Sequence, residues 1–112
     1  MKNVKATLLT VILMCVPFAA LADFRNGNSL LENCQAPAGA PGSFVCAGYV
    51  FAIADVQLFG DIGGVRSCVP ADVTGKQVID VVTRYLQQHP EQRHYGAASL
   101  VAYALSDSFS CN

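Results

Sequence analysis

The sequence carries little charge and lacks the short motifs that identify common enzyme classes. Only 13% of its 112 residues are charged, and there is no tryptophan. No Gly-x-Ser-x-Gly elbow, His-Glu-x-x-His pattern or Gly-rich phosphate loop is present. A run of basic residues is also absent, which argues against nucleic acid as a partner. We therefore expect a protein that is not an enzyme and that has no cofactor.

Closely spaced metal ligands are missing as well. No Cys-x-x-Cys pair occurs, and His89 and His94 stand outside any recognised zinc pattern. His89 is expected near the end of a helix, where a histidine interacts favourably with the helix dipole. The sequence therefore predicts no metal site.

The first 22 residues have the pattern of a signal peptide. Lys2 and Lys5 precede an apolar stretch over residues 6–16. In Ala20-Leu21-Ala22, the two alanines place small side chains at the −3 and −1 positions that a signal peptidase recognises. The apolar stretch is roughly half of the ~20 residues that a membrane span needs, which disfavours the alternative of an anchor helix. We expect cleavage after Ala22 and a secreted domain over residues 23–112 in an oxidising compartment, free of the membrane. Loss of two of the seven basic residues leaves five against eight acids, a net charge of −3.

The remaining chain predicts a small all-α, four-helix domain. Helices are expected near residues 29–34, 43–59, 74–89 and 91–108. Ser29 with Glu32 and Thr74 with Gln77 both fit the capping-box pattern that opens a helix. In the third helix, apolar residues recur at helical spacing and form one stripe: Val78, Val81, Val82, Tyr85 and Leu86.

The second and fourth predicted helices are apolar on more than one face. The second is expected to be central and buried on most sides, with Asp55 and Gln57 on an exposed stripe. A buried strand is the alternative for this segment, but its length favours a helix. The fourth is rich in alanine and in other small residues. We expect a homodimer that forms through the faces of these two helices that stay apolar after the monomer core is satisfied.

Four cysteines remain after cleavage of the signal peptide: Cys34, Cys46, Cys68 and Cys111. An even number in a short secreted chain indicates two disulfides, and four cysteines allow three pairings. Cys34 ends the first helix and Cys46 lies near the start of the second. If the third and fourth helices form an antiparallel hairpin, Cys68 and Cys111 meet at its open end. This arrangement predicts the pairs Cys34–Cys46 and Cys68–Cys111.

Several short strings spread over the chain carry a resemblance to a known family. They are Gly27 to Cys34 (GNSLLENC), Cys46 to Val50 (CAGYV), Cys68-Val69-Pro70, Val73-Thr74 with Gln77, Tyr85-Leu86, His89-Pro90-Glu91, Arg93-His94, and the closing Ala97, Leu105, Phe109 and Cys111. In this combination the chain resembles the Rap1a/Tai immunity proteins of bacterial type VI secretion systems. Two positions depart from the pattern: Ser110 stands where proline often precedes the last cysteine, and Ala52 where a second glycine is common.

The resemblance implies a function that composition does not give. Such proteins are periplasmic, helical and often dimeric, and they bind and inhibit peptidoglycan amidase effectors. The amidase is a cysteine endopeptidase that cuts the peptide stems of the cell wall. A small periplasmic stress chaperone, or a structural adaptor without a cognate effector, is the alternative.

Two surfaces are candidates for entry into an amidase cleft: residues 60–67, and the turn over residues 88–94. The first is favoured, because its glycines permit positive φ and its side chains offer two charges and two apolar groups. The second is expected to be structural, since Pro90 sets a helix break. The predicted partner-binding residues are Asp61, Ile62, Gly63, Gly64, Val65 and Arg66.

Overall fold

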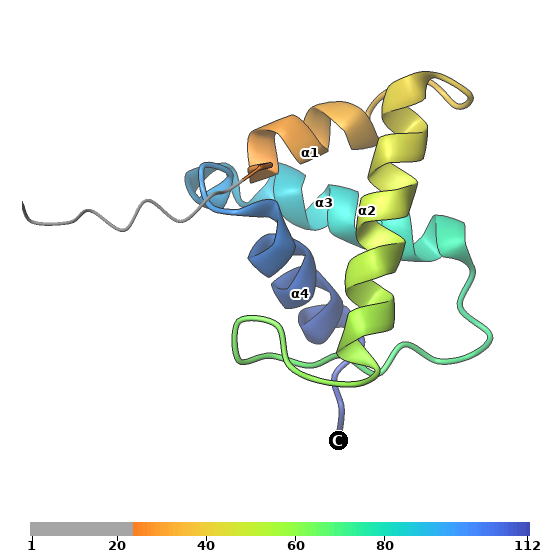
Figure 1. Ribbon diagram of the computed structural model, residues 1–112, viewed down its shortest axis with the longest axis vertical. Coiled ribbons are helices and arrows are strands. Elements are labelled where there is room, and N and C mark those ends of the chain that lie inside the picture. Colours follow the sequence, from red (N-terminus) through yellow and green to blue (C-terminus); the bar gives the residue numbers. More distant parts are fainter. Residues whose placement is uncertain (1–23) are drawn as a thin grey trace, which may run out of the picture.

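The computed structural model describes residues 24–112, and the predicted signal peptide over residues 1–22 lies outside this range. The described chain is all-helical, as predicted, and contains no strand (Figure 1). Its elements are α1 (Gly27–Cys34), α2 (Pro41–Gln57), α3 (Gly75–Gln88), the 3₁₀ turn η1 (Pro90–Gln92) and α4 (Ala97–Ser108). The long helix α2 packs against the other three, and α3 packs against α4.

Helix starts are set by local hydrogen bonds. The predicted box at Thr74 and Gln77 is confirmed: the Thr74 hydroxyl accepts from Gln77 N–H (3.2 Å), and Gln77 Oε1 accepts from Thr74 N–H (2.7 Å). The box predicted for Ser29 and Glu32 is wrong. Asn26 is the N-cap instead, and its side chain accepts from Ser29 N–H at 3.0 Å, so α1 begins two residues earlier. Sequence spacing missed this box because its fourth residue is Ser29, whereas the usual pattern has Glu or Gln at that position.

Helix α2 also begins earlier than predicted. Pro41 occupies its first position, where the missing N–H of proline costs nothing and its fixed φ suits the helix. Ser43, the predicted N-cap, lies inside the first turn and donates its hydroxyl proton to Ala40 O at 2.7 Å. The helix ends at Gln57 rather than near Phe59.

The fourth helix is shorter than predicted, because it starts at Ala97 and not near Glu91. The segment before it turns outward and pairs with the chain that enters α1. Gly27 N–H donates to Tyr95 O (3.0 Å), and Ala97 N–H donates to Arg25 O (2.9 Å). These long-range bonds replace the helical bonds that a continuous helix would make over residues 93–96.

The core is built from one face of each helix. Its fully buried aliphatic side chains come from all four helices: Leu30, Val50, Val82, Leu86, Val101 and Leu105. Alanines 97, 102 and 104 of α4 are buried as well, so the chain's own core accounts for most of the small apolar residues of this helix. These three alanines are therefore not available to a dimer interface, and the homodimer itself stays a prediction.

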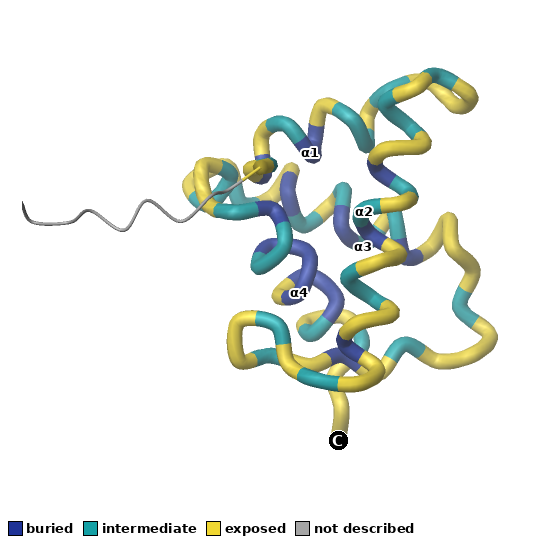
Figure 2. Tube along the Cα trace, viewed as in Figure 1, coloured by how far each residue is buried: buried dark blue, intermediate teal, exposed yellow. Residues whose placement is uncertain are grey.

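Helix α2 is less buried than predicted. Only Cys46, Val50 and Gln57 are fully enclosed, and much of its length is exposed (Figure 2). The cause is its position at the edge of a thin domain, where three helices cover only one side of it.

The two predicted disulfides, Cys34–Cys46 and Cys68–Cys111, are confirmed. The first joins the end of α1 to the start of α2 across a short Pro/Gly turn. The second joins the segment before α3 to the segment after α4, where Cys68 N–H also donates to Phe109 O at 2.7 Å. All four cysteines of the described residues are thus oxidised, so none of them offers a thiolate.

Candidate partner-binding surface

The six predicted partner-binding residues lie together in one tight turn between α2 and α3. Ile62 and Val65 exchange two backbone hydrogen bonds, at 3.0 and 3.2 Å. Gly63 and Gly64 stand between them with φ values of 60° and 80°. Positive φ at both central positions is the geometry of a type I′ turn, which glycine adopts without strain. The glycines therefore give this loop a defined tip rather than a loose one.

A buried glutamine anchors the turn to the rest of the domain. Gln57, the last residue of α2, is fully buried. Its Nε2 donates to Val65 O (3.2 Å) and to Ala102 O of α4 (3.4 Å), and its Oε1 accepts from the Ser67 hydroxyl (2.7 Å). The prediction that Gln57 lies on an exposed stripe with Asp55 is wrong for Gln57, whereas Asp55 is exposed. Because a buried amide must be paired, these bonds fix the base of the turn.

The two charges of the turn pair with each other at the surface. Arg66 Nε lies 4.0 Å from Asp61 Oδ1, both side chains are more than half exposed, and Arg66 also donates to Leu58 O at 3.4 Å. An exposed pair of this kind adds little stability, about 0–1 kcal/mol. Asp61 and Arg66 can consequently give up this contact and form ion pairs with groups on a partner instead.

The apolar side chains of the turn are less available than the sequence indicated. Ile62 and Val65 are half-buried against their own domain. Two neighbouring residues are exposed instead: Leu58 at 57% and Phe59 at 89%. Sequence reasoning missed them, since both were assigned to a buried helix. Single exposed apolar residues are common on protein surfaces, so Leu58 and Phe59 point to an interaction surface only together with other exposed apolar residues.

This exposed group continues along one face of α2. At helical spacing the face carries, in order, Phe44, Gly48, Phe51, Ala52, Asp55 and Val56, all exposed. We call this set the α2 face. Asp55 is its one charged member. The face leads toward the turn that follows α2, and two of its members, Phe51 and Asp55, also line a groove together with Val69, Val73 and Gly75.

The second predicted candidate, the turn over residues 88–94, is held mainly by internal contacts. His89 caps the end of α3, its Nδ1 lies 2.8 Å from Tyr85 O, and its ring stacks on Tyr85 with the ring centres 4.1 Å apart. Its place at the end of the helix agrees with the structural role expected for it.

Neither a metal site nor a membrane span is seen in the described part of the chain. Over residues 24–112 no group of three or more His, Cys, Asp or Glu side chains could hold a metal ion. Within the same residues no helix has both the length and the apolar character needed to cross a bilayer.

A helical scaffold, two disulfides and a turn held by a buried glutamine are compatible with a small binding protein. Comparison with known families agrees with this class. A family model described as Rap1a immunity proteins matches residues 26–111, nearly the whole described chain, and the chain therefore belongs to the Rap1a immunity protein family. No curated protein and no solved structure matches.

Membership in this family suggests immunity against secreted effectors and implies that the chain binds such an effector. It also suggests an inhibitor rather than an enzyme. Together with the disulfides, it suggests an extracellular or periplasmic protein.

Proposed function

We propose that the chain is a periplasmic immunity protein that binds and inhibits a type VI secretion peptidoglycan amidase effector. In this proposal residues 1–22 direct export and residues 23–112 form the active domain. The single observation that carries the proposal, beyond family membership, is the Gln57-anchored turn over residues 58–67. It is a protruding element that is already ordered, so binding would require little further loss of conformational freedom.

The shape of the turn suits a narrow catalytic cleft. Gly63 and Gly64 form a tip without side chains, which can approach a recessed nucleophile closely. Phe59 and Leu58 flank the base of the turn and can bury apolar area against the rim of the cleft. Asp61 and Arg66 can form ion pairs with rim residues of either sign. The inhibitor thus acts by occlusion and needs no chemistry of its own.

A charge-removal variant tests whether this turn is the inhibitory surface. Asp61→Ala combined with Arg66→Ala should weaken binding to the amidase by about 1–3 kcal/mol, measured by calorimetry. The melting temperature should hardly change, since the pair is exposed. The matched control is Lys76→Ala with Asp80→Ala, which removes the other exposed ion pair, on α3 (2.9 Å). If both double variants bind as tightly as the parent, the turn is only a connector.

We also propose that the protein is a homodimer, with the α2 face as its dimer interface. Gly48 has open space around its Cα, so a second helix could approach closely at this point. The phenylalanines on either side of it, Phe44 and Phe51, would then be buried between the two copies. Phe44→Glu should shift the protein to monomer in sedimentation experiments at micromolar concentration. Phe24→Glu is the control, because Phe24 is 97% exposed but lies away from α2. A parent protein that sediments only as monomer would contradict the proposal.

A stress chaperone is the second candidate function, and the exposed α2 face is the observation that favours it. A chaperone of this kind would use such a surface to hold unfolded clients, most strongly at low pH. Suppression of the aggregation of an unrelated client in acid, with no effect on any amidase, would support the chaperone. Inhibition of an amidase without such suppression would exclude it.

A further inference from the structure

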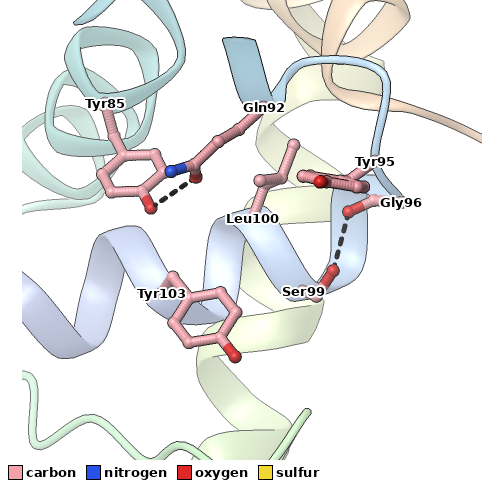
Figure 3. A pocket seen from close by; sticks show the side chains of 7 residues that line it. All are labelled: Tyr85, Gln92, Tyr95, Gly96, Ser99, Leu100 and Tyr103. Atoms are coloured by element: carbon pink, nitrogen blue, oxygen red, sulfur yellow. Dashed lines mark hydrogen bonds between the residues drawn. The ribbon is translucent and has the colours of Figure 1, made fainter. Parts of the chain in front are cut away.

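A second concave surface lies apart from the turn over residues 58–67. It is a groove of about 490 Å³ between α3, the segment that follows η1, and α4. Three of the chain's four tyrosines line it, each from a different segment: Tyr85, Tyr95 and Tyr103 (Figure 3). Tyr95 and Tyr103 are 55% and 42% exposed. Rings that are this exposed and that converge on one groove offer stacking surfaces to a ligand.

The groove is held in place by internal hydrogen bonds. The Tyr85 hydroxyl donates to Gln92 Oε1 (3.0 Å), and the Ser99 hydroxyl donates to Gly96 O (3.0 Å) (Figure 3). His89 stacks on Tyr85, and His94 packs against Tyr95 with ring centres 4.1 Å apart. The rings are consequently positioned before any ligand arrives, which lowers the entropic cost of binding.

Two carboxylates act electrostatically on Tyr85 of the groove, although neither of them lines it. Glu91 precedes Gln92, and Asp107 follows Tyr103 by one helical turn. Within residues 24–112 neither carboxylate takes part in an ion pair, and no lysine or arginine lines the groove. The pKa of Tyr85 is raised above its usual value of 10.0, first by burial and then by the charges of Asp107 and Glu91. Both carboxylates therefore remain outside the ion pairs of the described residues, and the basic residue nearest to the groove in the sequence is Arg93, between Gln92 and Tyr95.

We propose that the tyrosine groove binds a cationic side chain, an arginine or a lysine, presented by a protein partner. The face of an aromatic ring attracts a cation within about 6 Å of its centre, and a guanidinium can also stack on the ring. Glu91 and Asp107 add an attraction that a neutral ligand would not feel. An anionic ligand is disfavoured for the same reason. This proposal does not depend on the amidase assignment, because it concerns the chemistry of the ligand and not the identity of the partner.

The test uses a cation and its neutral isostere as probes of the oxidised, processed protein. N-acetyl-arginine methylamide and the corresponding citrulline compound differ only by the charged nitrogen. In nuclear magnetic resonance titrations, the arginine probe should shift the amide signals of Tyr95, Ser99 and Tyr103. Its affinity should exceed that of the citrulline probe by about two- to thirtyfold, the range that a cation–π contact supports.

Variants separate the roles of ring and charge. Tyr103→Phe should retain binding, Tyr103→Leu should reduce it severalfold, and Asp107→Asn should reduce the preference for arginine over citrulline. Asp72→Asn removes an exposed acid outside the groove and should leave that preference unchanged. Equal binding of the two probes, or tighter binding of an N-acetylglucosamine disaccharide, would overturn the proposal in favour of a neutral or glycan ligand. An unchanged melting curve for each variant ensures that loss of binding does not reflect loss of the fold.

Discussion

Replacing Gln57 with methionine should destabilise the domain far more than replacing an exposed glutamine. Methionine is close to glutamine in size but cannot make any of the three side-chain hydrogen bonds of Gln57. The hydroxyl of Ser67, a residue that is only 3% exposed, would lose its partner. A net hydrogen bond contributes about 1 kcal/mol, and an unpaired buried group costs about 1–3 kcal/mol, so we expect a loss of about 2–4 kcal/mol. In a domain of this size that corresponds to a drop in melting temperature on the order of 10–20 °C.

The measurement is chemical unfolding under non-reducing conditions, so that both disulfides stay closed. Gln87→Met, on the exposed side of α3, is the control and should stay within about 0.5 kcal/mol of the parent. A double-mutant cycle with Ser67→Ala adds a sharper test. The double variant should be more stable than the sum of the single losses predicts, by about 1–2 kcal/mol, since both partners of one bond are removed together. A small effect of Gln57→Met, or strict additivity with Ser67→Ala, would refute the anchoring role.

Three further predictions concern single residues of α1, of α2 and of the cap of α3. Gly27→Ala should destabilise by about 1–3 kcal/mol in denaturant unfolding, because the added Cβ would lie 2.5 Å from Leu100 Cδ1. Gly48→Ala should instead stabilise the isolated chain by about 0.5–1 kcal/mol, since no neighbouring atom lies within 4 Å of the new Cβ. Equal effects of the two changes would contradict this account of the glycines. Thr74→Ala should cost about 1 kcal/mol through loss of the α3 cap, and an unchanged unfolding midpoint would show that Gln77 N–H finds another acceptor.

Short-range patterns in the sequence were enough to predict most of the fold. The capping box at Thr74 and the apolar stripe of α3 are short-range features, and both correctly located this helix. The two disulfides also followed from helix order. The short turn after α1 brings Cys34 near Cys46, and the open end of two antiparallel helices brings Cys68 near Cys111. The fourth helix was placed too early for a different reason. Its start depends on two hydrogen bonds, from Gly27 N–H to Tyr95 O and from Ala97 N–H to Arg25 O, and such distant pairing leaves no periodic pattern.

The candidate surface was only partly predictable. The pair Gly63-Gly64 located the turn, but exposure of its neighbours depends on what packs nearby. Gln57 was misplaced although a signal was present: it falls on the same helical face as Cys46, Val50 and Ile53, which indicates burial. Phe59 lacked such a signal. Whether an apolar residue at the end of a helix is covered depends on the path of the following loop, which sequence periodicity does not describe.

The central claim is tested most directly by inhibition of a type VI secretion peptidoglycan amidase. The assay follows the release of stem-peptide fragments from purified peptidoglycan while the oxidised protein is added in increasing amounts. We predict that the activity of the cognate amidase falls to background near equimolar inhibitor, and that the Asp61→Ala and Arg66→Ala double variant needs a clear excess. Full amidase activity across a panel of such effectors, even with inhibitor in large excess, would contradict the account.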